Sequence, residues 1–184
     1  TDAVKVLRHA IFECCLLGTG VLKGPFSSFK EIQAWEVDGS GSRTYAPYKK
    51  NVPTISAVSC WDFYPDPAAT SIEDSDYVIE RHRMNREQLR SLQNKPHFDS
   101  DAINECLNSG PNYMERGYEN SLREENSSDT TNKSRYEVLE YWGYLDAALA
   151  KQLGLELPDD EDNLSSLHTN IWICGNRVLR AVVN

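Results

Sequence analysis

Residues 55–89 read ISAVSCWDFYPDPAATSIEDSDYVIERHRMNREQL, and this stretch contains several local patterns in succession. Its first part, with the two residues before it, is apolar and rich in β-formers, which predicts a buried strand over residues 53–63. Two prolines and five acidic residues between positions 62 and 76 then predict a loop. Residues 77–84 are β-rich again and are predicted to form the next strand.

A helix is predicted to follow this strand directly. Asn85 is a good N-cap residue, and Gln88 stands three positions later as the second member of a capping box. The predicted helix covers residues 86–93. The 35 residues of this stretch therefore combine the periodicity of strands with that of a helix.

On the N-terminal side, residues 3–17 have apolar side chains at helical spacing, and Gly18-Thr19-Gly20 is a suitable end for that helix. Two strands are predicted beyond it, over residues 29–37 and 43–48, with the turn Gly39-Ser40-Gly41-Ser42 between them.

On the C-terminal side the helical pattern continues before strands return. A helix is predicted from Asp99 or Ser100 to Gly110, and another from Pro111 to about residue 125. A polar loop at 126–134, which is a candidate mobile loop, leads to a strand at 135–145 and a short helix at 146–153. An acidic loop at 158–163 and strands at 167–174 and 177–183, joined at Gly175-Asn176, complete the chain.

This order of elements predicts an α+β fold with a mainly antiparallel sheet, an N-terminal helix and a central helical cluster. The length of 184 residues is compatible with one domain over residues 1–184. The chain begins Thr-Asp and ends in an apolar, strand-like run, which is typical of a fragment of a longer polypeptide.

The formal net charge of −9 argues against a basic nucleic-acid-binding surface. It is still compatible with DNA that slides past an acidic wall without sticking. The densest basic stretch, residues 80–86, also contains an acidic residue and is interpreted as an exposed strand end.

The number of cysteines, five, is odd, and none of them forms a CxxC motif. Reduced thiols are therefore a better interpretation than a disulfide framework or a zinc site. No membrane span or signal peptide is visible.

A search for catalytic motifs gives no candidate. The glycines at positions 18–24 lack the Gly-Lys-Ser/Thr order of a phosphate-binding loop. The four histidines do not form a zinc motif, and His82, between Arg81 and Arg83, is interpreted as a surface or pairing residue. The carboxylates between positions 62 and 76 lack EF-hand spacing, which favours a solvated loop over a metal site. We therefore predict no enzyme activity, and no catalytic, cofactor-binding or metal-binding residues.

The remaining candidate is a structural loop formed by Asp62, Phe63, Pro65, Asp66 and Pro67. The prolines restrict the backbone, and either aspartate can accept hydrogen bonds from local amides. This composition predicts a stiff loop that needs no catalytic explanation.

As a string of residues, this region resembles the portal, or head-to-tail connector, proteins of tailed bacteriophages. Their pattern is a "DF-x-x-DP-x-A" loop, an acidic turn, a "Y-V-I-x-R" strand and a helix of the "M-[TN]-x-x-x-L" kind. Three flanking pieces agree in order and spacing: residues 16–25, residues 136–143 (YEVLEYWG) and residues 171–180 (IWICGNRVLR).

The resemblance implies a non-enzymatic subunit of a ring at the capsid vertex, assembled in the host cytoplasm and then part of the virion. Double-stranded DNA would pass through such a ring during packaging and ejection, without sequence-specific contacts. Terminase and tail or adaptor proteins would be its other partners. Portal subunits are longer than this chain, so the resemblance indicates a fragment of the wing region.

Two alternatives stay open at this point. One is a stand-alone, prophage-encoded interaction module that binds another protein. The other is a metal-dependent hydrolase that uses carboxylates around Asp62 and Asp66.

Overall fold

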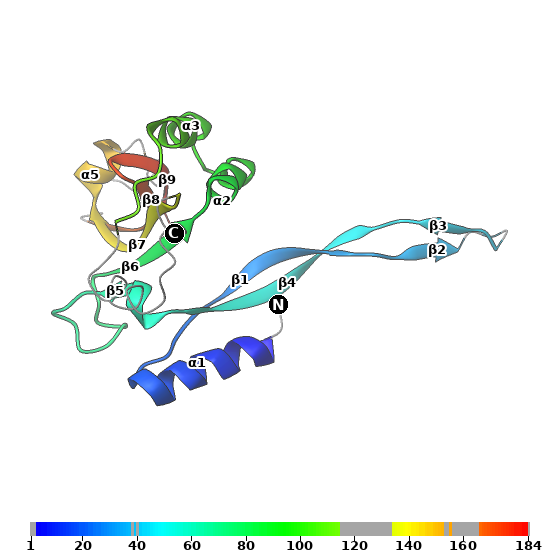
Figure 1. Cartoon of the computed structure of the whole chain (residues 1–184), viewed down its shortest axis with the longest axis horizontal. Coiled ribbons are helices and arrows are strands. Elements are labelled where there is room, and N and C mark those ends of the chain that lie inside the picture. The colour runs from blue at the N-terminus through cyan, green and yellow to red at the C-terminus, as the bar shows by residue number, and fades with distance from the viewer. Residues whose placement is uncertain are drawn as a thin grey trace. The chain divides into compact units, whose positions relative to one another are not determined.

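The computed structural model describes residues 3–37, 39, 41–114, 134–152, 155 and 166–183 (Figure 1). They fall into two units, Thr1–Trp61 and Asp62–Asn184, which we call unit 1 and unit 2. The single domain expected over residues 1–184 stays a prediction, because two such units can still fold as one cooperative domain. Among the described residues, no helix has the length and apolarity needed to cross a membrane.

Unit 1 consists of one helix and a long β-ribbon. Helix α1 (Ala3–Leu17) has the predicted bounds, and Gly18 ends it with a positive φ of 82°. Gly20 lets the chain turn back closely along the helix, since a Cβ there would collide with the Ala10 carbonyl oxygen. The ribbon pairs β1 (Val21–Ile32) with β4 (Tyr48–Val58), and at its tip β2 (Trp35–Val37) with β3 (Arg43–Tyr45), all antiparallel.

The predicted buried strand at 53–63 is wrong. Strand β4 ends at Val58, and Val58 is its one buried residue. The reason is that the ribbon has two strands and is contacted by the single helix α1, so residues 54–57 are half-buried rather than buried. A short 3-10 helix (Cys60–Asp62) then crosses the boundary between the units.

Unit 2 is built on a five-stranded antiparallel sheet. Its strand order is β5-β6-β7-β8-β9, so each strand pairs with its neighbour in the sequence. The strands are β5 (Phe63–Pro65), β6 (Tyr77–Met84), β7 (Tyr136–Asp146), β8 (Ser166–Cys174) and β9 (Arg177–Val183). This architecture confirms the predicted α+β fold with mainly antiparallel strands.

Two helices that follow β6 pack on one face of this sheet (Figure 1). Helix α2 (Arg86–Ser91) has the predicted capping box: the Gln88 amide donates to Asn85 Oδ1 at 2.8 Å, and the Asn85 amide donates to Gln88 Oε1 at 2.9 Å. A 3-10 turn (Leu92–Asn94) continues it. Helix α3 (Ser100–Ser109) is capped by Asp99 and ends at Gly110, as predicted.

The main core lies between these helices and the sheet. Its fully buried members include Leu89 and Ile103 from the helices and Val138 and Leu179 from the strands. A second, smaller cluster forms where α5 (Ala147–Gln152) packs Ala150 against Leu167. Side chains alternate between the two faces of a strand. In β8 the even-numbered Trp172 therefore belongs to the main core, and the odd-numbered Leu167 belongs to the smaller cluster on the opposite face.

Some predicted elements lie outside the described residues. They are the loop at 126–134, except for Ser134, the acidic loop at 158–163, and most of the helix expected from Pro111. Residues 111–114 are described and are not helical, so that helix does not begin at Pro111 as predicted.

Candidate functional site

Strand β6 carries an ionisable residue at four successive positions, Glu80, Arg81, His82 and Arg83. Because neighbouring side chains point to opposite faces, Arg81 and Arg83 lie on one face of the sheet and Glu80 and His82 on the other. The strand therefore organises two separate polar clusters, one on each face.

The first cluster connects β6 to the predicted structural loop through Asp62. Arg81 Nε donates to Asp62 Oδ1 at 2.8 Å, and Arg81 Nη2 lies 2.7 Å from the same oxygen. Arg83 Nη2 donates to Asp62 Oδ2 at 2.7 Å. Both oxygens of this buried carboxylate thus accept charge-assisted hydrogen bonds, which are the stronger kind.

Arg81 is the buried member of this arrangement, with a side chain that is 0% exposed. Burial works to lower the pKa of the Arg81 guanidinium, but the hydrogen bond and the charge of Asp62 outweigh it, so the net pKa is raised. The Arg81 guanidinium also lies over the Tyr113 ring, 5.6 Å from its centroid. The exposed strand end expected at residues 80–86 is therefore wrong for Arg81, because Asp62 compensates the burial of its charge.

The other residues of the predicted loop have local roles. Phe63 and Pro65 belong to β5 and pair with Glu80 and Val78 of β6. Asp66 Oδ1 accepts a hydrogen bond from the Ala68 amide at 2.9 Å, as expected for an aspartate that caps its own turn. Pro67 lies exposed in that turn.

The acidic turn that follows is fastened to the sheet by backbone hydrogen bonds. The Asp66 amide donates to the Tyr77 carbonyl at 3.1 Å, and the Tyr144 amide donates to the Asp76 carbonyl at 3.1 Å. Gly143 permits this close approach, since a Cβ there would stand 2.6 Å from the Asp76 carbonyl oxygen. The loop and its turn are thus structural parts of the sheet edge.

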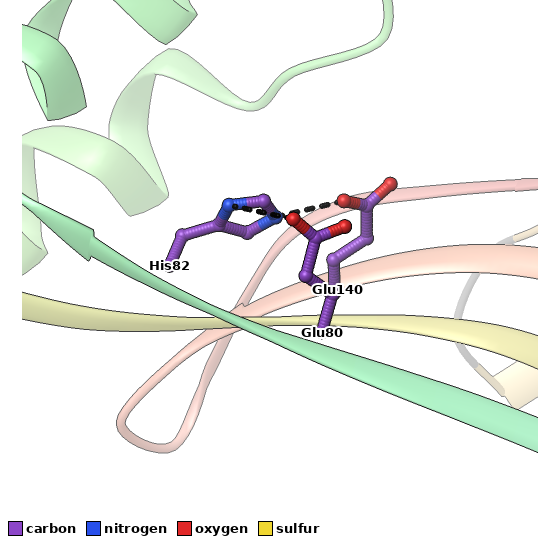
Figure 2. Close-up of side chains that lie close together, drawn as sticks. All are labelled: Glu80, His82 and Glu140. Atoms are coloured by element: carbon purple, nitrogen blue, oxygen red, sulfur yellow. Dashed lines mark hydrogen bonds and ion pairs between the residues drawn. The ribbon is translucent and has the colours of Figure 1, made fainter. Parts of the chain in front are cut away.

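The second cluster contains Glu80, His82 and Glu140 (Figure 2). His82 Nε2 lies 2.8 Å from Glu140 Oε2, and His82 Nδ1 lies 3.6 Å from Glu80 Oε1. Glu80 and Glu140 are directly opposite each other on β6 and β7, a position in which two negative charges repel. His82 lies two residues along the strand from Glu80, and each of its ring nitrogens faces one of the two carboxylates.

Glu140 is the centre of this cluster and is only 2% exposed. Its Oε1 accepts hydrogen bonds from Trp142 Nε1 at 2.7 Å and from Asn170 Nδ2 at 3.1 Å. The His82 ring stacks on Trp172, with ring centroids 4.8 Å apart and planes 4° from parallel. The interpretation of His82 as a pairing residue is thus confirmed by its contact with Glu140.

We considered whether this second cluster could hold a metal ion, because one ligand atom from each residue lies within 4.8 Å of the others. The geometry fits poorly. The two His82 nitrogens face different carboxylates, and both Glu140 oxygens already have partners at hydrogen-bond distance. An ion would have to displace His82 from Glu140, which makes a hydrogen-bonded charge network the better description.

The two buried cysteines, Cys106 and Cys174, lie together in the main core. Burial, followed by the influence of Cys106, raises the pKa of the Cys174 thiol to about 12. Cys106 Sγ lies 3.7 Å from the Cys174 carbonyl oxygen, inside the main core. A thiol that stays protonated near neutral pH is a packing residue rather than a reactive one.

The pattern of the loop, strand β6 and strand β7 agrees with a known protein family. Residues 41–148, more than half of the chain, match the family described as Phage SU10 portal protein. The chain belongs to this portal protein family. The matched residues include the structural loop, both polar clusters and the YEVLEYWG strand, whereas residues 16–25 and 171–180 lie outside the match.

Membership of the portal family gives the chain a phage portal-related role. Portal proteins are structural components of the phage virion and work as oligomers. No curated protein matches the chain significantly.

The sequence predicted the loop but missed the residues that hold it. The signal for these residues is the run of four ionisable side chains at 80–83 of a predicted strand, which must point alternately to its two faces. Alternation indicates which residues share a face, but it does not reveal that Asp62 and Glu140 are their partners, 19 and 58 residues away in the sequence.

Proposed function

We propose that this chain is the wing-like part of a portal subunit, and that twelve or a similar number of such subunits form a ring at one capsid vertex. Double-stranded DNA passes through the ring during packaging and ejection, and terminase and tail or adaptor proteins dock on it. The ring assembles in the host cytoplasm and remains in the virion. The observation that carries this proposal is the family match over residues 41–148.

Two physical features support a passive role towards DNA. Residues 62–184 contain 12 Lys or Arg against 23 Asp or Glu, a net charge of −11. A surface of that charge repels the phosphate backbone, which suits DNA that must move without being retained. The polar contacts of the two clusters join residues within unit 2, Asp62 to Arg81 and His82 to Glu140.

The hydrolase alternative loses its main candidate ligand. Both Asp62 oxygens face guanidinium groups of Arg81 and Arg83 at 2.7 to 2.8 Å. A carboxylate held in this way can bind a cation only after two cationic side chains leave it. The stand-alone interaction module stays as the second candidate, because unit 1 exposes many large apolar side chains.

Light scattering tests the proposal on two proteins, this 184-residue chain and the longer polypeptide that contains it. We expect the chain alone not to close into a stable ring, because the ring contacts lie mostly in the additional segments, and the longer polypeptide to form one large ring. A longer polypeptide that stays monomeric at high concentration contradicts the portal ring and favours the interaction module. A stable dodecamer of the chain alone contradicts its description as a wing-like part.

A further inference from the structure

Cys106 of helix α3 and Cys174 at the end of strand β8 meet in the main core of unit 2. Both are free thiols, and the residues are 4% and 3% exposed. Cys106 Sγ donates to the Cys174 carbonyl oxygen at 3.7 Å, and Asn112 Nδ2 donates to Cys174 Sγ at 3.7 Å. The two cysteines are thus neighbours in the fold, although 68 residues separate them in the sequence.

The two thiols also interact with each other directly. After burial, the strongest influences that raise the pKa of the Cys174 thiol come from Cys106, through the charge of its thiolate and through a side-chain hydrogen bond. A disulfide requires two cysteines whose backbones are close and whose side chains point towards each other. The contact of Cys106 Sγ with the Cys174 carbonyl oxygen brings this sulfur to the backbone of Cys174, where a disulfide needs it.

The pair lies at the edge of the core, next to side chains that reach solvent. The hairpin turn at residues 175–176 directly follows Cys174 and is exposed. Arg177 interacts with Cys106, and its Nε donates to Glu105 Oε2 at 2.7 Å. The side chains of Arg177 and Glu105 are 35% and 63% exposed. A small thiol reagent can therefore reach Cys106 when these two surface side chains move aside.

The raised pKa of the Cys174 thiol affects the two directions of disulfide exchange differently. A protonated thiol attacks other sulfurs slowly, so Cys174 resists modification while it is reduced. The thiolate of a high-pKa cysteine is also a poor leaving group, so a disulfide that contains Cys174 reopens slowly. A bond between the two cysteines would therefore form slowly and then persist.

We propose that Cys106 and Cys174 form a disulfide once the virion has left the reducing cytoplasm, and that this bond fastens helix α3 to the end of β8. The timing rests on the virion role proposed above, whereas the pairing rests on the contacts alone.

The oxidant is a small-molecule disulfide. Cys106 loses its proton and attacks one sulfur of the oxidant, which forms a mixed disulfide and releases one small thiolate. Cys174 then loses its proton and attacks Cys106 Sγ, which forms the protein disulfide and releases the second small thiolate. Two protein thiols are oxidised, and one small disulfide is reduced to two thiols, which take up the two protons.

Glutathione equilibration tests the pairing on the full chain. The other three cysteines are replaced in one variant, Cys14→Ser/Cys15→Ser/Cys60→Ser, which leaves this pair alone. The variant is equilibrated with mixtures of oxidised and reduced glutathione, natively and in concentrated urea, and alkylation with mass spectrometry then gives the disulfide fraction. We expect the equilibrium constant for the disulfide to be at least about 100-fold larger in the native chain, because the fold already closes the long loop. An equal or smaller native constant, or mixed disulfides alone, contradicts the proposal.

Thermal unfolding provides the second measurement. The oxidised triple variant should unfold at least about 5 °C above its own reduced form, because the bond limits the unfolded chain. The matched control adds Cys174→Ser, so that Cys106 can form only a mixed disulfide with glutathione. Oxidised glutathione should not raise the midpoint of this control above that of its reduced form. An equal rise in the control would assign the effect to the reagent and contradict the disulfide.

The outcomes separate this inference from the portal ring. If the longer polypeptide forms rings in which both thiols stay reduced after glutathione equilibration, the disulfide is wrong and the ring stands. If the chain forms the disulfide but the longer polypeptide never forms rings, the pairing stands and the portal ring fails. Producing cells that are lysed directly in alkylating reagent should contain both cysteines in the alkylated, reduced form. A disulfide already present there contradicts the proposed timing.

Discussion

Among the described residues, unit 2 buries most of its large apolar side chains wholly or partly, whereas unit 1 leaves most of its large apolar side chains exposed to solvent. Leu89, Ile103 and Leu179 of unit 2 are 0% exposed, while Ile11 and Leu16 of helix α1 are 61% and 67% exposed. The difference follows from the number of layers. The sheet of unit 2 is covered by helices, but a single helix and a two-stranded ribbon cannot surround one another.

This difference indicates that buried side chains of unit 2 contribute most to stability, and that exposed apolar side chains of unit 1 are available for contacts with partners. Substitutions in unit 2 should change the free energy of unfolding, because they remove buried interactions. Substitutions in unit 1 should change assembly with little effect on unfolding, because their side chains already contact water. The following predictions test that division, from the largest expected effect to the smallest.

Asp62→Ala should lower the free energy of unfolding by about 3–5 kcal/mol, since it removes the carboxylate that is hydrogen-bonded to the buried Arg81 guanidinium. Denaturant unfolding followed by tryptophan fluorescence measures the loss. Glu73→Ala, an exposed acid in the same loop, is the control and should change stability by less than about 0.5 kcal/mol. Similar losses in both variants would contradict the structural role of the Asp62–Arg81 pair.

Leu89→Ala should cost about 2–5 kcal/mol, because it leaves a cavity in the core of unit 2. Leu16→Ala in helix α1 makes the same chemical change at an exposed position and should cost under about 0.5 kcal/mol. The same unfolding measurement compares them directly. If Leu16→Ala is as costly as Leu89→Ala, unit 1 has a core that its exposed side chains do not indicate.

Glu140→Gln should cost about 1–3 kcal/mol, because the new amide group directs a donor at His82 or at the Trp142 and Asn170 donors. Glu80→Gln should cost less, since the Glu80 side chain is more exposed and its contact with His82 is longer. Thermal unfolding of the two variants gives the ranking. A larger loss for Glu80→Gln would show that Glu140 is not the centre of the network.

Asp66→Ala should have the smallest effect, about 0.5–1 kcal/mol, because it removes one hydrogen bond to the exposed Ala68 amide. Calorimetric titration with Ca²⁺ and Mg²⁺ should give the same result for the variant and the parent chain. Micromolar metal binding that disappears in the variant would return the loop to the metal-site interpretation.

Several local elements and the protein family were predictable from the amino-acid sequence. Helix α1 with its end at Gly18, the Asn85–Gln88 capping box and the strand at 77–84 were all predictable, because each signal lies within a few adjacent residues. The string of residues around the loop was sufficient for the portal resemblance, since a string of that length is specific without knowledge of its contacts.

The burial of charged residues and the exposure of apolar residues were not predictable from the sequence, because both depend on tertiary contacts. In the sequence Arg81 resembles a surface residue, because its partner Asp62 lies 19 residues away. Residues 53–63 resemble a buried strand, but β4 ends at Val58 and most of its residues are exposed or half-buried. Burial and pairing depend on residues distant in the sequence, such as His82 and Glu140, so hydrophobicity and charge alternation cannot specify them alone.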